Sequence, residues 1–549
     1  MFNEFFSSVF TAEDLTNVPG IASRNLDLQL KGIEFRKEDV FKLLSELNPN
    51  KSPGPDNIHP RVLKECSAAL SEPCYVLFCK SLSEGKIPQN WKEGNIAPIH
   101  KKGSRNQVGN YRPISLTSVV CKTLEKIIRK ELLNHIVENR ILSESQHGFV
   151  YRRSCMTQLL QVFDKVAELL DQGEDIDIIY LDIAKAFDTV PHHRLIVKLQ
   201  SYGVSDEILN WIKSFLENRR QRVLVAGSHS AWAPVTSGIP QGSVLGPVLF
   251  VCYINDMPDV VTSLIFIYAD DTKIVRKIST EDDRRELQRD LNDLIGWTRP
   301  WQLKFNAAKC KVMHIGSGNG CRGYTMEECG QLVQLENTTE EKDLGIWFDN
   351  KLRFSTHIEN AVSKANKILG LIKRSFVYKD EFVMKRLFTA LVRPHLEYGN
   401  VIWSPQFKCD VDRIERIQRR ATKMIPGFQT LSYESRLQKL DLPSLVYRRY
   451  RGDAIETYKY LNGYYAVDSS AFLPLDPNHH NTRGHTQKLL KRRCRTQRRL
   501  NSFGFRVVNM WNSLPDYVVT APTVNSFKSR LDKHWTHLKF EMKTDLFKS

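Results

Sequence analysis

The sequence predicts a mixed α+β protein with more than one domain. The chain has 549 residues, which is too long for one compact core. It is 41% hydrophobic and 26% charged, as is usual for folded globular proteins, so global disorder is not expected. Continuous β-prone runs at 176–182 and 264–268 alternate with long stretches of helical spacing, such as 119–139 and 357–375.

The predicted elements follow from hydrophobic spacing along the chain. A first helix at 37–47 ends before 51–56 (KSPGPD), because two prolines and a glycine cannot continue it. Further helices are expected at 60–84, 119–139, 157–171, 195–216, 244–255, 281–297, 357–375, 380–398 and 410–425, with short helices over 503–538. Strands are expected at 96–99, 176–182, 223–226, 264–268, 272–275, 301–305, 310–315 and 344–348.

The net charge of +17 suggests a polyanionic partner, either nucleic acid or an acidic membrane surface. No apolar run is long enough to span a bilayer, and residues 1–10 lack the basic start of a secretory signal. A soluble basic surface is the alternative, but the basic residues cluster, which favours nucleic acid. We expect an intracellular protein, in the nucleus and cytoplasm.

The eleven cysteines include no C-x-x-C pair and show no zinc-finger spacing. Cys310, Cys321 and Cys329 lie near one another, as do Cys66, Cys74 and Cys79, but neither group has an accompanying histidine pair. We interpret all eleven as reduced thiols.

Two adjacent carboxylates, Asp270 and Asp271, occupy the predicted hairpin turn after strand 264–268. Aspartate pairs are common in surface turns, but buried strands rarely end in two unpaired carboxylates without a function. Mg²⁺ prefers carboxylate oxygens and keeps other positions for water and phosphate. The turn is therefore a candidate metal site.

Asp182 ends the other buried strand, within LDIAKAFD at 181–188. It either caps the following helix or joins Asp270 and Asp271 in one cluster. Asp182 by itself does not decide between the two interpretations. The predicted hairpin with Asp270 and Asp271 further along the chain favours the cluster. Such a cluster suits two Mg²⁺ ions, with Mn²⁺ as a substitute.

The segment 237–243 (SGIPQGS) is typical of a turn between a strand and a helix. Its glycines and proline allow the backbone to approach a ligand closely, and Gln241 can hydrogen-bond a nucleotide or template. Taken alone, the segment indicates only a turn. Because it lies between Asp182 and Asp270 in the sequence, it is a more specific indication of function.

Taken in order, these motifs resemble the palm of reverse transcriptases: Asp182 with Phe187, then P-Q-G at 240–242, then Y-A-D-D at 268–271. Further segments resemble the jockey-type family of non-LTR retrotransposons, at 51–56, 110–116 (NYRPISL), 146–155 (QHGFVYRRSC), 181–190, 238–247, 253–256 and 342–346. The resemblance covers about residues 35–430 and continues more weakly to the end.

The resemblance implies an RNA-directed DNA polymerase with an α+β right-hand fold. The expected regions are a lead-in at 1–50, fingers with part of the palm at 51–175, the palm at 176–350, a helical thumb at 351–440 and a basic C-terminal region at 441–549. The expected partners are an RNA template, a DNA primer and deoxynucleoside triphosphates, with no membrane.

The resemblance also assigns residues to the chemistry. Asp182, Asp270 and Asp271 would bind the metal ions. Phe187, five residues after Asp182, would be the gate that excludes a ribose 2′-hydroxyl, and an ordinary core phenylalanine is the alternative.

Other residues would handle the nucleotide. Gln241 and Gly242 would lie beside it, and Arg112 and Arg153 would contact triphosphate or template, unless they are simply solvent-facing arginines. Lys309 resembles the lysine that protonates the leaving pyrophosphate, although two neighbouring lysines compete for that assignment.

The chain departs from the family pattern in places. Arg152 stands where the family often has glycine, which predicts a different finger turn. Elements of this type carry an endonuclease before the polymerase, whereas residues 1–50 look like the linker. No clear RNase H carboxylate set or cysteine-rich knuckle is found in the sequence. We therefore expect the chain to be the 3′ part of an element, read as a separate gene.

Two clusters of basic residues follow the palm, on the helix 410–425 and in the segment 483–499, and both are expected to bind phosphates. The selected residues are Arg413, Arg416, Arg420, Arg492 and Arg493. For the helix we favour a thumb contact to the primer–template duplex. A solvated charge run and a nuclear-import signal are the alternatives for the tail, whose aromatic residues we expect in a small core.

Two rival functions stay open. One is a relic or recruited nucleic-acid-binding protein that no longer polymerises, and the intact carboxylates argue against it. The other is a metal-dependent nuclease, but Phe187 and the P-Q-G loop favour nucleotide selection.

Overall fold

The structure is a computed structural model that describes residues 1–21, 29–318, 320, 323–328, 330–477 and 484–543. Cys321, Cys329, Arg483 and part of the predicted loop 474–485 lie outside these residues. The nine cysteines within the described part are free thiols, as predicted. No helix in that part is long and apolar enough to cross a membrane.

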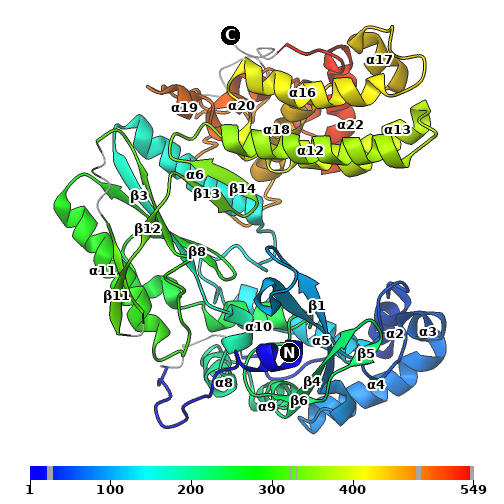
Figure 1. Cartoon of the computed structure of the whole chain (residues 1–549), viewed down its shortest axis with the longest axis vertical. Helices are drawn as coiled ribbons and strands as arrows, with labels where there is room; N and C mark the ends of the chain where they lie inside the picture. Colours follow the sequence, from blue (N-terminus) through cyan, green and yellow to red (C-terminus); the bar gives the residue numbers. More distant parts are fainter. Residues whose placement is uncertain (22–28, 319, 321–322, 329, 478–483, 544–549) are drawn as a thin grey trace.

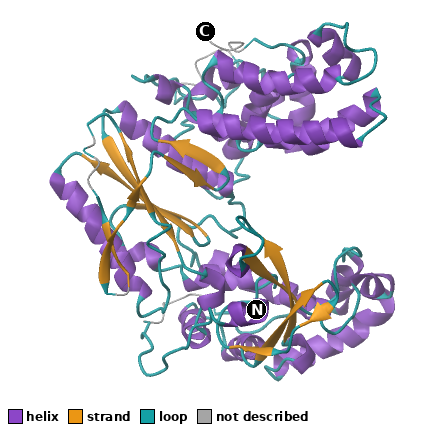
Figure 2. Ribbon diagram, in the orientation of Figure 1, coloured by secondary structure: helices purple, strands orange, loops and turns teal. Residues whose placement is uncertain are grey.

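The chain has a C-shaped outline with a lower lobe, a central sheet and an upper lobe (Figure 1). The N-terminus lies in the lower lobe, and the last long helix, α22 (Val524–His534), lies in the upper one. Figure 2 shows the upper lobe as packed helices, whereas both other parts contain strands.

The lower lobe packs helices around a mixed sheet. Its helices are α1 (Phe2–Ser7), α2 (Lys37–Ser45), α3 (Pro60–Glu65), α4 (Ser67–Ser83), α5 (Val119–Glu138), α8 (His192–Ser201), α9 (Asp206–Leu216) and α10 (Gly246–Tyr253). Its strands are β1 (Glu93–His100), β2 (Tyr111–Leu116), β4 (Arg219–Val225), β5 (Ser228–His229) and β6 (Ala233–Val235). β1 pairs antiparallel with β2 and parallel with β4.

The central sheet has the strand order β12-β9-β3-β8-β7. These strands are β3 (Asp175–Asp182), β7 (Leu264–Tyr268), β8 (Asp271–Ile278), β9 (Lys311–Ile315) and β12 (Glu336–Asn337). Around the sheet are α6 (Cys155–Asp171), α7 (Ala186–Thr189), α11 (Glu281–Thr298) and the hairpins β10–β11 (Thr325–Glu328, Gln331–Gln334) and β13–β14 (Glu340–Asp343, Ile346–Asp349).

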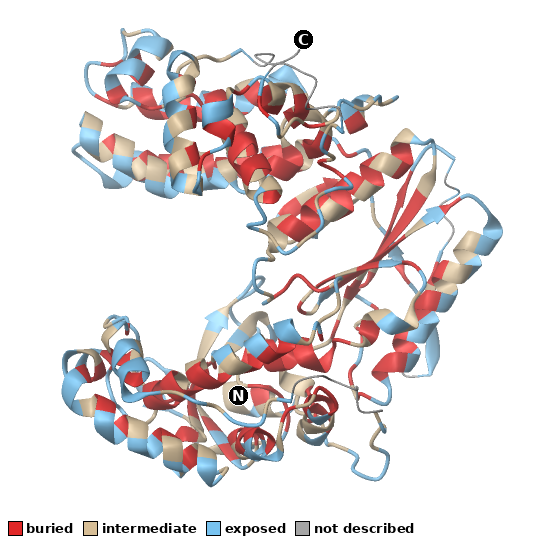
Figure 3. Cartoon of the chain, turned by 180° about the vertical axis from the view of Figure 1, so that it is seen from behind, coloured by how far each residue is buried: buried red, intermediate tan, exposed pale blue. Residues whose placement is uncertain are grey.

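Strand β3 is buried on both faces, as its continuous β-prone run predicts. Ile179 and Leu181 point into the core that fills the lower lobe. Ile176 and Ile178 point the other way, into the core shared with α6 and the upper lobe. Figure 3 shows the buried residues running along this sheet and its flanking helices. β3 therefore links the two cores.

The upper lobe joins the predicted thumb and C-terminal region in one core. Its helices are α12 (Ser355–Ser375), α13 (Glu381–Leu387), the π-helical segment η4 (Phe388–Val392), α14 (Arg393–Glu397), α15 (Asn400–Trp403), α16 (Lys408–Lys423), α17 (Tyr433–Leu440), α18 (Leu445–Leu461), α19 (Gln497–Leu500), α20 (Phe503–Asn512), α21 (Asp516–Val519) and α22 (Val524–His534). Phe503 and Trp511 are buried in this core, as expected for the tail aromatics, whereas Phe505 is only half-buried.

Three element predictions are wrong. The expected helix 60–84 is divided at Cys66 into α3 and α4. The expected helix 195–216 is divided into α8 and α9, because Gly203 takes a positive φ of 74° that ends the first helix. The expected strand 301–305 is a turn in which Gln302 has a φ of 50°, and only Phe305 makes a bridge, to Ile183.

Candidate active site

Three aspartates lie at one end of the central sheet. Asp182, the last residue of β3, lies directly opposite Asp271, the first residue of β8. Tyr268 of β7 also pairs with Asp271, so Ala269 and Asp270 form a two-residue turn between them. The predicted hairpin is confirmed, and β-sheet register places all three aspartates together.

The turn is held in an unusual backbone conformation from outside the hairpin. Ala269 has a φ of 56°, a region that non-glycine residues rarely adopt. The Gln146 side-chain oxygen accepts hydrogen bonds from the backbone N–H of Ala269 (3.0 Å) and of Gly148 (2.8 Å). A Cβ on Gly148 would lie 2.4 Å from the Ala269 nitrogen, so only glycine permits this approach. The sequence reasoning missed this role of Gln146.

Asp270 and Asp271 have pKa values above their ordinary range. Solvent reaches the Asp271 side chain, but the surrounding protein removes part of its hydration. This desolvation, followed by Asp270, Asp343 and Asp182, raises the Asp271 pKa to about 6, against the effect of Lys273. The pKa of Asp270 is also raised, first by burial and then by Asp182. Negative charge is thus concentrated here, and a bound cation would relieve it.

Lys309 is the lysine that reaches this cluster. Its Nζ lies 2.7 Å from Asp182 Oδ2, whereas Lys311 pairs with Glu341 at 3.5 Å. Among the described residues, no three histidine, cysteine, aspartate or glutamate side chains lie close enough together to ligate one ion. The ligand type and charge fit a divalent cation, and Asp182 is engaged by Lys309.

The β1–β2 hairpin brings positive charge to the carboxylates. Arg112 of β2 is solvent-exposed and acts electrostatically on Asp270. Lys101, just after β1, interacts electrostatically with Asp182 and Lys309. Its pKa is lowered chiefly by desolvation and then by Arg112. The structure therefore places the predicted Arg112 at the site and adds Lys101, which the sequence showed only as part of a basic turn.

Arg153 has a different environment. Its guanidinium donates hydrogen bonds to the backbone oxygens of Ser143, Glu144, Gln146 and Ala466, at 2.7–3.3 Å. It ties the segment that carries Gln146 to the upper lobe. The neighbouring Arg152 has a φ of 58°, which explains why glycine suits this position.

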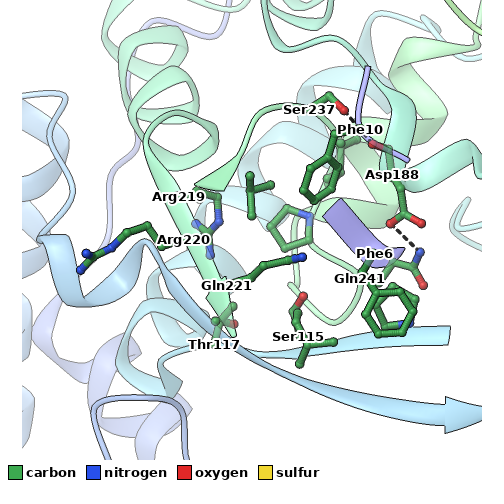
Figure 4. A pocket seen from close by; sticks show the side chains of 17 residues that line it. Phe6, Phe10, Ser115, Thr117, Asp188, Arg219, Arg220, Gln221, Ser237 and Gln241 are labelled. Carbon is green, nitrogen blue, oxygen red and sulfur yellow. Dashed lines mark hydrogen bonds between the residues drawn. The ribbon is translucent and has the colours of Figure 1, made fainter. Parts of the chain in front are cut away.

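The P-Q-G loop packs between β2 and α7. Gly242 has a φ of 118°, and a Cβ there would lie 2.7 Å from the backbone oxygen of Ser115. The Ser115 N–H donates to the Gln241 backbone oxygen at 2.7 Å. Figure 4 shows Gln241 and Ser237 hydrogen-bonded to Asp188, at 2.9 and 2.8 Å.

Asp188 is a further site residue that the sequence reasoning did not single out. Burial raises its pKa to about 6, and the hydrogen bond from Gln241 opposes that rise. Phe187, its neighbour in α7, stacks on Phe250 with 4.5 Å between ring centroids and is only half-buried. Phe187 therefore packs on the lower core while part of its ring stays accessible.

The N-terminal lead-in also packs against this region. Phe6 and Phe10 line a small cavity of about 40 Å³ together with Ser115 and Gln241 (Figure 4). The Lys185 ammonium lies over the Phe5 ring, 5.0 Å from its centroid. Residues 1–10 thus cover part of the P-Q-G loop, a contact that the interpretation as a linker did not foresee.

The five selected basic residues of the upper lobe differ in their contacts. Arg413 pairs with Glu359 at 3.2 Å, and Arg420 bonds the Asn366 oxygen at 2.7 Å. Arg492 donates to two backbone oxygens, of Ala471 and Phe472. Arg416 and Arg493 are exposed and make no hydrogen bond or ion pair within the described part of the chain.

Asp271→Asn should stabilise the metal-free protein above about pH 6. The folded chain holds the Asp271 proton more tightly than the unfolded chain, because its pKa rises from 3.8 to about 6. Stability is therefore lost as pH rises between these values, and the variant escapes this loss. Thermal unfolding with a chelator should show a higher midpoint for the variant at pH 8 and no difference below about pH 4. Asp293→Asn, at an exposed position on α11, is the control, and equal midpoints at pH 8 for all three proteins would refute the expectation.

Comparison with known proteins assigns this site to a family. The family described as "Reverse transcriptase (RNA-dependent DNA polymerase)" matches residues 99–371, a span that includes every residue of the carboxylate site. Members of that family use divalent metal ions, and the aspartate cluster agrees with this.

Similar curated proteins come from insect mobile elements. The RNA-directed DNA polymerase from mobile element jockey is 29% identical over 71% of this chain in Drosophila melanogaster, and 30% identical over 71% in Drosophila funebris. The probable RNA-directed DNA polymerase from transposon BS of Drosophila melanogaster is 29% identical over 73%. The matched regions make up only 44%, 44% and 45% of those proteins, so the chain spans less than half of their length. Through residues 99–371, the chain belongs to the reverse transcriptase family, and it is similar to the polymerases of jockey-type non-LTR retrotransposons.

Proposed function

We propose that this chain is an RNA-directed DNA polymerase that adds deoxynucleotides to the 3′ end of a DNA primer on an RNA template. The observation that carries the proposal is the pairing of Asp182 with Asp271 beside the Asp270 turn. The lower lobe would serve as fingers, the central sheet as palm and the upper lobe as thumb. The place of action would be intracellular, in the nucleus and cytoplasm.

The aspartates would hold two Mg²⁺ ions, with Mn²⁺ as a substitute. When bound, the ions supply the charge that favours attack of the primer 3′ oxygen on the α-phosphate and departure of pyrophosphate. Lys309, now on Asp182, would be released to protonate the leaving pyrophosphate. Arg112 and Lys101 would neutralise the triphosphate from the fingers side.

The P-Q-G loop and α7 would select the nucleotide. Gly242 and the Ser115 backbone fix the loop, so that Gln241 and Gly242 present a rigid surface to the incoming nucleotide. Phe187, half-exposed and braced by Phe250, would block a 2′-hydroxyl. In this role the Phe187 ring excludes the hydroxyl sterically, and stacking on Phe250 holds the ring in place.

The upper lobe would hold the primer–template duplex through basic residues. A groove between α12 and α16 is lined by Lys367, Arg374 and Arg413, with Glu359 as a single acidic lining residue. Arg416 and Arg420 lie on the same helix α16. Arg493 would add a phosphate contact, whereas the bonds of Arg492 to backbone oxygens suit a supporting role.

Primer extension tests the polymerase directly. With an RNA template, a DNA primer, deoxynucleotides and Mg²⁺, the parent chain should extend the primer. An Asp270→Asn, Asp271→Asn double variant should lose at least about a thousandfold in rate, because both ligands are removed from the metal cluster. Asp293→Asn should extend like the parent. If the parent binds RNA and stays folded but does not extend, the proposal is wrong and a binding protein without polymerase activity is the better account.

Phe187→Ala should relax the choice of sugar. Removing the ring opens the space that a 2′-hydroxyl would need, so ribonucleotide incorporation should rise by about tenfold or more relative to deoxynucleotides. Single-nucleotide kinetics with matched ribo- and deoxyribonucleotides measure this ratio. Phe382→Ala, at an exposed phenylalanine of α13, is the control. An unchanged ratio in an active Phe187→Ala protein would show that Phe187 is only a core residue.

A further inference from the structure

The upper lobe contains a cavity that the proposed polymerase chemistry does not use. Its volume is about 540 Å³, within the range of small-molecule sites. It lies where the loop before α16 meets α18 and α20. Charged and polar side chains form much of its wall: Gln406, Lys408, Arg449, Asp453, Lys491, Gln497, Asn501, Arg506 and Asn509.

Arg449 is the feature that marks this cavity as a binding site. Its side chain is only 9% exposed. Within the part of the chain that the structure describes, its guanidinium makes no hydrogen bond or ion pair. Glu415 acts on it electrostatically, but the Glu415 carboxylate is bonded to the Tyr433 hydroxyl at 2.6 Å and to the backbone of Leu445. The guanidinium faces the cavity, and an anion bound there would supply the partner that it lacks within the described chain.

The remaining charge of the cavity also favours an anion. Asp453 is the one carboxylate among the lining residues, and both of its oxygens are taken by Arg506, at 2.8 and 2.9 Å. Lys408 and Lys491 are exposed on the wall and add positive charge. Four cationic side chains therefore face a single, already paired carboxylate.

The amide side chains narrow the class of ligand. Gln406 and Asn501 each use one amide N–H on a backbone oxygen, of Leu352 and Gln497. Their side-chain oxygens and second N–H groups, with the Gln497 amide, can pair with the polar edge of a nucleobase. The volume suits one nucleotide. The pairing edge of a base can reach protein side chains only when the base is unpaired.

We propose that this cavity binds one unpaired nucleotide of a single-stranded RNA, with the phosphate on Arg449 and Lys491 and the base against the amides. It would anchor the RNA template in the upper lobe, away from the carboxylates. The inference rests on the proposed function, because that function supplies the RNA.

Crosslinking with mapping of the modified peptides tests the proposal. A short single-stranded RNA containing 4-thiouridine is bound to the full chain, irradiated and digested, and the adducts are located by mass spectrometry. Adducts are expected on peptides from α18 and from residues 497–509, and separately on peptides near Asp270. Arg449→Gln should lower the first set by roughly tenfold or more, since a charged hydrogen-bonding group is lost, and should leave the second set unchanged.

Two further variants keep the result interpretable. Lys491→Gln removes an exposed charge of the cavity, so it should reduce the same adducts without affecting folding, which thermal unfolding checks for both variants. Arg289→Gln removes an exposed charge from α11 and should change neither set.

Other outcomes overturn the inference. Adducts near Asp270 without adducts at the cavity would refute the cavity proposal and leave the polymerase proposal standing. A lack of adducts in both places would count against both proposals. Equal labelling by a thiothymidine-containing single-stranded DNA would show that the cavity does not select RNA.

Discussion

The burial of β3 on both faces is the constraint on which the rest of the structure depends. One face of the strand belongs to the lower core and the other to the core shared with the upper lobe. A one-residue slip would exchange the two faces, so its register against β8 is strongly specified. That register sets Asp182 opposite Asp271. The position of the candidate catalytic carboxylates is thus a consequence of hydrophobic packing.

The same packing brings negatively charged side chains together, and the surrounding residues neutralise them only in part. Asp270 and Asp271 have raised pKa values because burial and neighbouring carboxylates disfavour their charged forms. Lys309 relieves only Asp182. Below the cluster, Lys273 and Asp343 form a buried ion pair, so that lysine is already engaged. A site with uncompensated negative charge is suited to a cation. Without one, the repelling carboxylates lower the stability of the folded protein, as is common at functional sites.

The sequence was sufficient for the parts of the fold that depend on local pattern. The apolar runs of β3 and β7 and the helical spacing of α5, α6, α11, α12 and α16 all appear where predicted. The site residues of the sheet and Arg112 are also found together. Hydrophobic period cannot show where a glycine interrupts a helix, which is why the break at Gly203 was missed. The roles of Gln146 and Asp188 depend on partners more than 50 residues away, and no local signal reveals such contacts. Arg153, which resembles a substrate contact in sequence, is bonded to backbone oxygens both of its own loop and of the distant Ala466.

The central claim is that the end of β3 and the β7–β8 turn form a metal site for nucleotidyl transfer. The position of Mn²⁺ tests it most directly, measured by anomalous scattering from crystals of the chain with an RNA template, a DNA primer and a deoxynucleoside triphosphate. The account predicts peaks among Asp182, Asp270 and Asp271, with the Lys309 ammonium displaced from Asp182. Peaks elsewhere on the protein, or none at these aspartates while nucleotide is bound, would contradict it.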